Sequence, residues 1–388
     1  MMESMYLIKY GEISLKGENR KLFEKQLRKN ILAKLKDIPA RIDHKPGRVY
    51  LYTQKEYTRQ VEHALSTVFG LVGFSKATPC QKNIDIIQEI AIQLAGNYRK
   101  NNPGRTFKIE ARRTDKSFPL SSYEIACKTG AGICTAFPEF TVDVKNPDWT
   151  LSIEVREQVY MYGETFPGLR GLPAGCNGRS LLLLSGGIDS PVAGLLMAKR
   201  GLYVDAVYFH TPPYTSEKAK DKVKQLAEVL GTYIPSFKLY GVNFSEIQVC
   251  IAQHAPVKAI TLFSRAHMMK IANLLAERIH ATSLITGECL GQVASQTPES
   301  LRFTGSFSAL PVFRPLIGMD KEEIILKARK FGTFDISTQP FDDCCTIFAP
   351  DHPLIKPKYD EIIDDFHSLQ TNELIQKAVG DAELLIRS

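Results

Sequence analysis

The sequence has no pair of cysteines at the C-x-x-C spacing of a zinc ribbon, although it contains eight cysteines. Without such pairs, a structural zinc site of that kind is disfavoured. It also lacks an apolar run long enough to cross a bilayer, and its first residues lack the charged and apolar regions of a secretory signal. We therefore expect a cytoplasmic protein with no membrane contact, in which most thiols are small buried hydrophobes.

Positive charge is concentrated in the first third of the chain. Residues 1–50 carry 12 Lys and Arg against 6 Asp and Glu, and residues 99–130 carry 8 against 3. Residues 131–388 carry 25 against 29, although the whole chain has a net charge of +7. A basic front joined to a slightly acidic remainder predicts a polyanion-binding platform attached to a separate chemical domain. The alternative is that these side chains form solvated helix faces with no partner.

The first 75 residues follow the strand and helix order of a ferredoxin-like α+β module. Apolar residues recur every four positions at Phe23, Leu27, Ile31 and Leu35, which predicts one buried helix face. The solvent face of that helix is basic and is the first candidate polyanion-binding surface. It carries Lys21, Lys25, Arg28 and Lys29.

Residues 76–165 predict a second compact α/β module. The run 106–113 is rich in strand formers, the run 121–133 begins with a serine that can cap a helix, and the run 149–163 alternates as two strands. Basic residues gather at one helix end and in the following loop. The candidates there for binding a polyanion are Arg112, Arg113 and Lys116.

A glycine- and proline-rich stretch at 166–178 predicts a linker, and residues 179–388 then alternate strands with helices. This alternation is typical of a doubly wound, mostly parallel sheet with helices on both faces. Within it, Asp320 is expected to cap a helix that Gly332 ends. The tail that begins at Asn372, NELIQKAVGDAELLIRS, is expected to be helical.

The stretch SLLLLSGGIDSPVAG, residues 180–194, combines a buried strand, a glycine loop and a helix start. Its leucines are apolar without alternation, as in a central parallel strand, and Pro191 suits a first helical turn. The two glycines allow positive φ and close approach of a ligand, and backbone N–H groups at a helix start hold anions. The anion-binding candidates are Ser185, Gly186, Gly187 and Ser190.

Asp189 distinguishes this loop from a purely structural turn. A carboxylate beside a phosphate is repulsive unless a cation bridges them, and Mg²⁺ binds through one or two carboxylates together with phosphate oxygens. The loop lacks both the G-K-[ST] of a Walker A motif and the pattern G-x-G-x-x-G. The hexapeptide SGGIDS instead resembles the PP-loop of the ATP pyrophosphatases. That resemblance implies ATP, Mg²⁺ and cleavage between the α- and β-phosphates.

Further nucleotide contacts are expected at the carboxyl ends of the parallel strands. Four segments face that edge by topology. They are the end of the first strand, the YFH stretch after the second strand, one residue of a long helix and the loop TGECLGQVASQT (286–297). For the helix arginine and the loop glutamine, a surface charge and an ordinary loop amide are equally good explanations. These candidates are Leu183, Leu184, Tyr208, Phe209, Arg265, Gly287 and Gln296.

Two adjacent cysteines, Cys344 and Cys345, stand in the stretch DDCCTIFAP. In one interpretation, one of them is simply buried. In the other, a thiolate accepts a sulfane sulfur, and the resulting persulfide attacks an activated carbon. The acidic neighbours disfavour a thiolate, so a basic neighbour or a helix N-terminus would have to compensate.

The order of these motifs resembles that of the tRNA 4-thiouridine synthetases over essentially the whole chain. KYGEISLKGENR (9–20) is similar to their opening motif, RRTDKSFPLSSYEI (112–125) to the core of their RNA-binding THUMP domain, and TGECLGQVASQT to their nucleotide-site loop. The resemblance implies that ATP adenylates O4 of a uridine at the junction of the acceptor and D arms of tRNA. A persulfide, best matched by Cys344 and next by Cys345, then delivers sulfur to C4 and AMP leaves.

The resemblance also implies partners. Sulfur would come from a PLP-dependent cysteine desulfurase, directly or through a carrier, and the enzyme would be a homodimer. Family members are also linked to making the thiazole of thiamine. Some carry a C-terminal rhodanese domain whose cysteine relays sulfur, which we do not expect here because the chain stops at Ser388. The thiol that closes the catalytic disulfide therefore stays open: Cys345, another cysteine of the chain or an external thiol.

Two other hypotheses stand beside this one. The first keeps the PP-loop chemistry but changes the acceptor, as in an amidotransferase-like enzyme or a tRNA lysine ligase, which need no cysteine. The second is an RNA-binding adaptor with a vestigial nucleotide site. The intact Asp189 and both loop glycines speak against the adaptor.

Overall fold

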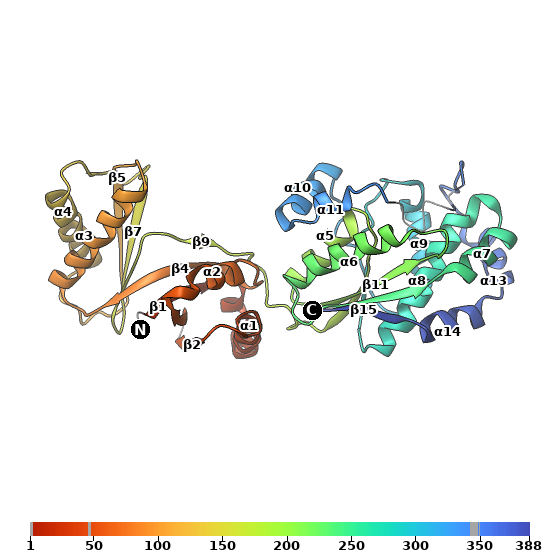
Figure 1. Ribbon diagram of the computed structural model, residues 1–388, viewed down its shortest axis with the longest axis horizontal. Helices are drawn as coiled ribbons and strands as arrows, with labels where there is room; N and C mark the ends of the chain where they lie inside the picture. The colour runs from red at the N-terminus through yellow and green to blue at the C-terminus, as the bar shows by residue number, and fades with distance from the viewer. Residues whose placement is uncertain (1–2, 46–47, 342–347, 349) are drawn as a thin grey trace. The chain divides into compact units, whose positions relative to one another are not determined.

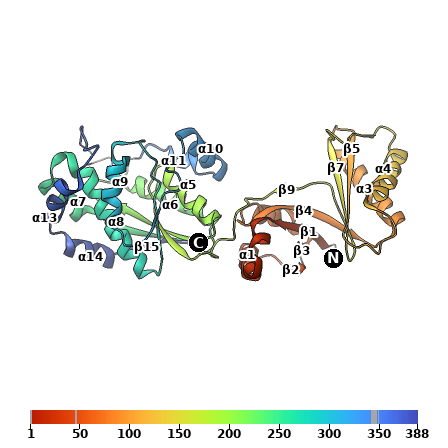
Figure 2. The same cartoon turned by 180° about the vertical axis from the view of Figure 1, so that it is seen from behind.

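The computed structural model describes residues 3–45, 48–341, 348 and 350–388 (Figures 1 and 2). Its contacts divide the chain into two compact units. The front unit comprises Met1–Arg20 and Ile31–Arg170, and the PP-loop unit comprises Lys21–Asn30 and Gly171–Ser388. Within the described residues, no helix is both long and apolar enough to cross a membrane.

Among its described residues, the front unit contains one sheet of nine strands. Its strands are β1 (Glu3–Tyr10), β2 (Ala40–Lys45), β3 (Arg48–Gln54), β4 (Leu71–Cys80), β5 (Thr106–Arg113), β6 (Thr141–Val142), β7 (Trp149–Val155), β8 (Val159–Tyr162) and β9 (Phe166–Pro167). β4 pairs with β1 on one side and with β8 on the other, so both predicted modules share one strand. The boundary expected between residues 75 and 76 falls inside it.

Helices cover this sheet where the apolar patterns predict them. They are α2 (Thr58–Ser66), α3 (Ile84–Asn101) and α4 (Ser122–Ala136), and α1 (Arg20–Lys34) contributes its C-terminal residues. α3 and α4 lie side by side next to β5 and β7 (Figures 1 and 2). Ser121 caps α4 in a capping box with Glu124, which confirms the predicted helix start. The core beneath α3 and α4 is apolar, with Ile87, Phe107, Ile125 and Leu151 fully buried.

A buried carboxylate joins the two predicted modules of the front unit. Glu154 on β7 accepts hydrogen bonds from Arg48 Nη2 on β3 at 2.8 Å and from Tyr162 Oη at 2.9 Å. Arg48 Nε and Arg156 Nε add further bonds at 3.3 and 3.0 Å. Burial would raise the pKa of Glu154, but hydrogen bonds and the charge of Arg48 lower it to about 2. Together with the shared β4, this network makes one folded unit from both modules.

In the part of the PP-loop unit that the structure describes, six strands form one sheet. Its strands are β10 (Arg179–Leu183), β11 (Tyr203–His210), β12 (Lys238–Asn243), β13 (Leu284–Ile285), β14 (Val312–Phe313) and β15 (Glu383–Arg387), in the order β14-β13-β10-β11-β12-β15. All pairs are parallel except β12 with β15. The chain runs from β10 to β11 and β12 on one side, then returns to β13 and β14 on the other. The predicted doubly wound sheet is confirmed, with its switch point between β10 and β13.

Helices pack on both faces of this sheet. They are α5 (Asp189–Lys199), α6 (Glu217–Gly231), α7 (Ser245–His254), α8 (Ile260–Arg278), α9 (Pro298–Gly305), α10 (Lys321–Phe331), α11 (Phe334–Ser337), α13 (Tyr359–Ser368) and α14 (Asn372–Gly380). α5 and α6 lie on one face, whereas α8 and α14 lie on the other (Figures 1 and 2). The predicted ends of α10 are confirmed, because Asp320 forms a capping box and Gly332 adopts a φ of 77°.

The expectation of a helical tail is wrong for its last residues. α14 ends at Gly380, and β15 then pairs antiparallel with β12. The edge of β12 would otherwise expose unpaired backbone groups, which β15 satisfies. Gly241 on β12 leaves room for the incoming strand, since a Cβ there would lie 2.7 Å from Leu385 Cδ1. A partner distant in the sequence therefore overrides the local helix pattern.

Candidate nucleotide site

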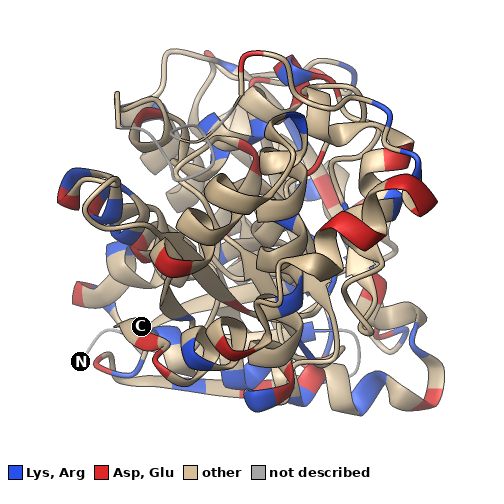
Figure 3. Cartoon of the chain, turned by 90° about the vertical axis from the view of Figure 1, so that its right-hand side faces the viewer, with Lys and Arg blue, Asp and Glu red and all other residues tan. Residues whose placement is uncertain are grey.

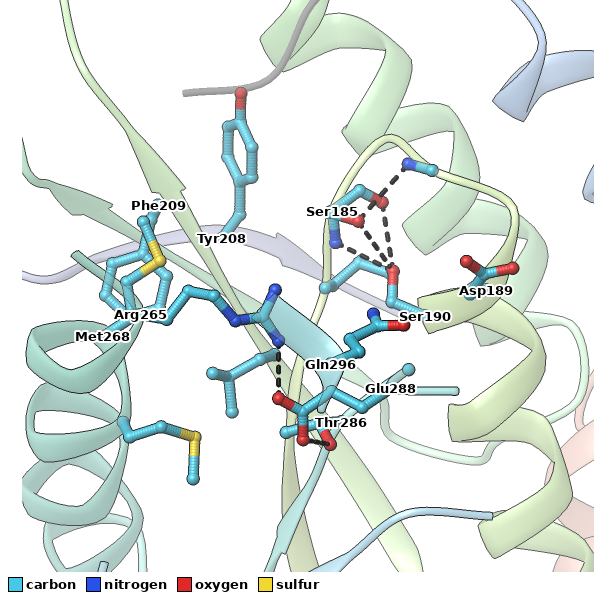
Figure 4. Close-up of a pocket in the computed structure, with 15 residues that line it drawn as sticks. Ser185, Asp189, Ser190, Tyr208, Phe209, Arg265, Met268, Thr286, Glu288 and Gln296 are labelled. Atoms are coloured by element: carbon cyan, nitrogen blue, oxygen red, sulfur yellow. Dashed lines mark hydrogen bonds and ion pairs between the residues drawn. The ribbon is translucent and has the colours of Figure 1, made fainter. Parts of the chain in front are cut away.

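A cavity of about 260 Å³ lies at the carboxyl ends of β10, β11 and β13, and so includes the switch point of the sheet (Figure 4). It is lined by eleven of the twelve residues predicted to bind the nucleotide; the other, Gly186, lies within the same loop. The eleven are Leu183, Leu184, Ser185, Gly187, Asp189, Ser190, Tyr208, Phe209, Arg265, Gly287 and Gln296. The structure thus brings together residues from four separate elements, and their role in binding ATP stays a prediction.

Two serines shape the PP-loop. The backbone N–H of Ser185 donates to Ser190 Oγ at 2.9 Å, and the two hydroxyl oxygens are 3.1 Å apart. The N–H of Gly187 donates to Ser185 Oγ at 3.3 Å. These bonds, drawn as dashed lines in Figure 4, hold the loop closed at the first turn of α5. The free N–H groups and partial positive charge of a helix start favour an anion there.

Gly187 and Gly287 differ in how closely other atoms approach them. Gly187 does not use the positive φ that glycine allows, and a Cβ there would meet only Ser185 Oγ, at 3.4 Å. Gly287 is tightly constrained, because its Cβ would lie 2.7 Å from the backbone N of Ser190. A side chain at 287 would therefore collide with the start of α5. Gly287 lets the strand end at β13 pack against the PP-loop helix.

Asp189 lies between a cation and an amide. Its carboxylate is 2.6 Å from Lys321 Nζ, at the first residue of α10, and it accepts a hydrogen bond from Gln292 Nε2 at 2.9 Å. Among the residues that the structure describes, no three His, Cys, Asp or Glu side chains gather as a metal cage. A single carboxylate beside a phosphate site does fit Mg²⁺, which commonly takes its remaining ligands from phosphate oxygens and water.

A buried charge cluster forms the floor of the pocket. Both oxygens of Glu288 are used: Oε1 accepts from Arg265 Nη2 at 2.5 Å, and Oε2 accepts from Arg314 Nε at 2.7 Å and Thr286 Oγ1 at 2.8 Å. Burial by itself would raise the pKa of Glu288, but the two arginines outweigh it and the pKa lies below its usual value. One carboxylate between two guanidinium groups leaves one net positive charge at this floor.

The remaining wall of the pocket is apolar. Met268 and Met269 of α8 face the cavity together with Phe209, whose ring packs against buried Phe244 (Figure 4). An apolar wall opposite a polar loop suits a ligand with a flat heterocycle at one end and charge at the other. The methionines were not predicted, because on a helix buried on almost every side they are indistinguishable from core residues.

Five polar residues of the site were not named individually by the sequence analysis. Three of them, Thr286, Glu288 and Gln292, stand in the predicted nucleotide loop. Arg314 had a usable signal, because it follows a strand end at the edge of the sheet where ligands commonly bind. Lys321 begins a helix whose cap was recognised, but nothing in the sequence connects it with Asp189, 132 residues away.

The predicted sulfur-carrying pair, Cys344 and Cys345, lies outside the described residues. The structure describes the other six cysteines. The one next to the pocket is Cys289, which is buried and donates through Sγ to the carbonyl of Met319 at 2.9 Å.

The candidate basic residues occupy two surfaces. On α1, all four predicted residues are exposed, and Arg112 and Lys116 are exposed in the front unit. Arg113 is different, because its Nη1 donates to the carbonyls of Phe118 and Leu120 at 2.8 and 3.1 Å and holds the loop between them. On the PP-loop unit, basic and acidic residues are interspersed along the helices (Figure 3), in keeping with its balanced composition.

A doubly wound sheet with the loop S-G-G-x-D-S at its switch point defines the PP-loop class of nucleotide-binding enzymes. Family profiles match nearly the whole chain. The ThiI ferredoxin-like domain matches residues 5–75, the THUMP domain residues 81–164 and the thiamine biosynthesis protein (ThiI) residues 175–370. The chain therefore belongs to the ThiI family of tRNA sulfurtransferases.

Individual relatives support this assignment along the full length. A probable tRNA sulfurtransferase of Thermoanaerobacter pseudethanolicus is 46% identical over 98% of both chains, and one of Acetivibrio thermocellus is 44% identical over 99% of both. A crystal structure of a 4-thiouridine synthetase–RNA complex with bound ATP is 34% identical, covers 100% of both chains and has a TM-score of 0.92. The structure of PH1313 from Pyrococcus horikoshii is 27% identical, with a TM-score of 0.67, over 85% of this chain and 99% of the other.

Proposed function

We propose that this enzyme uses ATP to convert a uridine of tRNA, at the junction of the acceptor and D arms, to 4-thiouridine. The observation that carries the proposal is the full-length similarity to a 4-thiouridine synthetase crystallised with RNA and ATP. A pocket built from the PP-loop, with a polar floor and an apolar wall, supports it. The exposed basic face of α1 supports a polyanionic partner.

In the first step, O4 of the uridine attacks the α-phosphorus of ATP and pyrophosphate leaves. The start of α5 and the hydroxyls of Ser185 and Ser190 bind the phosphates, and the net positive floor around Arg265 attracts the same anion. Leu183, Leu184, Tyr208 and Phe209 enclose the nucleoside. Asp189 would hold Mg²⁺, which would supply positive charge to offset the negative charge of the leaving pyrophosphate.

In the second step, the terminal sulfur of a persulfide on Cys344, or on Cys345, attacks C4 of the uridine and AMP leaves with its oxygen. A second thiol then attacks the cysteine sulfur, which releases 4-thiouridine and leaves a disulfide that an external dithiol reduces. The persulfide sulfur would come from a PLP-dependent cysteine desulfurase. The match to a thiamine biosynthesis family supports a second role in supplying sulfur for the thiamine thiazole. We also propose that the enzyme works as a homodimer.

The test is mass spectrometry of tRNA nucleosides after incubation with enzyme, ATP, Mg²⁺ and sulfide, which bypasses the sulfur donor. We expect one sulfur-for-oxygen exchange at a single uridine, together with AMP and pyrophosphate. Asp189→Asn is expected to lose pyrophosphate release without losing the fold. Release of AMP and pyrophosphate without sulfur in tRNA would instead favour another PP-loop ligase, and the absence of both products would favour an RNA-binding adaptor.

A further inference from the structure

One buried lysine of the PP-loop unit has no part in the steps above. Lys222 lies on the inner face of α6, beside Val223 and Leu226, and is 5% exposed. Burying an ammonium group is costly unless its hydrogen bonds are satisfied, and a methionine would fill a similar space without that cost. A lysine at this position therefore has a reason beyond packing.

The partners of Lys222 point to that reason. Among the described residues, its Nζ donates to two backbone carbonyls, that of Gln339 at 2.9 Å and that of Phe341 at 3.3 Å. The N–H of Phe341 donates back to Gln339 at 2.9 Å, so the ammonium holds a tight turn. Gln339 Nε2 also donates to Gln225 of α6 at 3.3 Å. Helix α6 thus holds this turn through hydrogen bonds to the backbone of the turn and to the side chain of Gln339.

The same segment is tied to the PP-loop at its other end. Ser337, the last residue of α11, donates through Oγ to the carbonyl of Gly187 at 3.2 Å. Residues 337–341 therefore run from the phosphate loop to the Lys222 anchor. In the sequence, Phe341 is followed by Asp342, Asp343 and then the cysteine pair.

We propose that Lys222 is a positioning residue for sulfur transfer, because it anchors the backbone that leads into the Cys344–Cys345 pair. The inference rests on the proposed function. Its physical basis is that a thiol must be presented to the activated carbon with sub-ångström accuracy, and hydrogen bonds to carbonyls fix backbone position directly. Adenylation uses the nucleotide pocket, which Lys222 does not line.

The test compares Lys222→Met with Lys224→Met, a matched change on the outer side of the same helix. With tRNA and ATP but no sulfur source, pyrophosphate release measures adenylation. With a cysteine desulfurase and cysteine, mass spectrometry of nucleosides measures thiolation. We expect Lys222→Met to lower thiolation by about a hundredfold while adenylation stays at the wild-type level, because misplacement by about 1 Å costs that much. Lys224→Met should match the wild type in both assays.

Two further variants separate positioning from folding. Lys222→Arg retains a cationic donor and should recover part of the thiolation, and Ser337→Ala should weaken the same segment from its other end. Equal loss of adenylation and thiolation in Lys222→Met, or unchanged thiolation, would overturn the inference. Failure of the wild-type enzyme to form 4-thiouridine would instead overturn the proposed function, which keeps the two results distinct.

Discussion

At the scale of single residues, the site depends on charges that are buried in pairs and triads. Glu288 is the clearest case, because its side chain is buried and forms ion pairs with both Arg265 and Arg314. Removing one member of such a cluster leaves the others unpaired in a poorly solvated place. The arginine that faces the cavity would then lose its fixed orientation.

We therefore expect Glu288→Gln to weaken ATP binding about tenfold and to destabilise the PP-loop unit by about 3 kcal/mol, the usual cost of breaking a buried ion pair. Calorimetric titration with ATP and denaturant unfolding measure the two effects. Thr286→Val is the matched control, because it removes one hydrogen bond but leaves both ion pairs. Unchanged ATP affinity in Glu288→Gln would show that the orientation of Arg265 does not depend on its ion pair with Glu288.

Glu154 makes the stability of the front unit depend on pH. Its pKa is about 2 in the folded protein, against an ordinary value of 4.5. Because the folded pKa is the lower one, the stabilisation is complete above pH 4.5 and is lost as the pH falls towards 2. The difference in unfolding free energy between the wild type and Glu154→Gln should shrink over this range. Hydrogen exchange of the β7 amides would measure this difference. A difference that does not change with pH would contradict the lowered pKa of Glu154.

At the scale of elements, strands that pair across long sequence distances hold each unit together. β4 joins both halves of the front sheet, and β15 completes the other sheet at its β12 edge. Ser388, directly after the last strand, also lies against α6, since a Cβ on Gly231 would lie 2.6 Å from Ser388 Oγ. These contacts make the C-terminus part of the PP-loop unit.

Deletion of residues 383–388 is expected to expose the β12 edge and to lower the melting temperature by several degrees, with increased aggregation. Differential scanning calorimetry and light scattering would measure both effects. Leu384→Ala is a suitable control, because this side chain is 50% exposed and its loss leaves the strand pairing intact. A deletion variant with wild-type stability would show that the pairing of β15 with β12 does not stabilise the PP-loop unit.

At the scale of the whole molecule, positive charge follows the order of the sequence rather than the boundary between the two units, because residues 21–30 of α1 belong to the PP-loop unit. The basic surplus lies in the first 130 residues, whereas the remainder carries a slight negative excess. A polyanion that binds mainly through phosphates releases counterions, so its affinity falls steeply with salt. The proposed tRNA interaction should follow that rule.

Lys25→Glu on α1 is expected to weaken tRNA binding and to reduce the slope of log affinity against log salt by about one. Lys330→Glu, on an exposed position of α10, is the control with the same change in net charge. Filter binding of tRNA at several salt concentrations measures both slopes. Equal effects of the two variants would mean that net charge alone, rather than the α1 surface, controls binding.

The sequence predicted the fold class and most of the pocket for a local reason. In SLLLLSGGIDSPVAG the strand, loop and helix are adjacent, so hydrophobic pattern, glycines and helix-start chemistry suffice to place Ser185, Asp189 and Ser190. Asp320 and Gly332 marked the ends of α10 by the same local logic. The tail was mispredicted because its conformation depends on β12, more than 140 residues earlier in the chain.

What the sequence determined by itself is therefore the order of modules, the strand–loop–helix segment of the PP-loop and the family to which the chain is similar. Only the tertiary structure decided which distant residues meet at that loop. Three sets of contacts join elements far apart in the chain. They are the Glu288 cluster with Arg265 and Arg314, the ion pair of Lys321 with Asp189, and the hydrogen bonds by which Lys222 anchors residues 337–341. Such contacts depend on sheet topology and helix packing, and neither can be deduced from neighbouring residues alone.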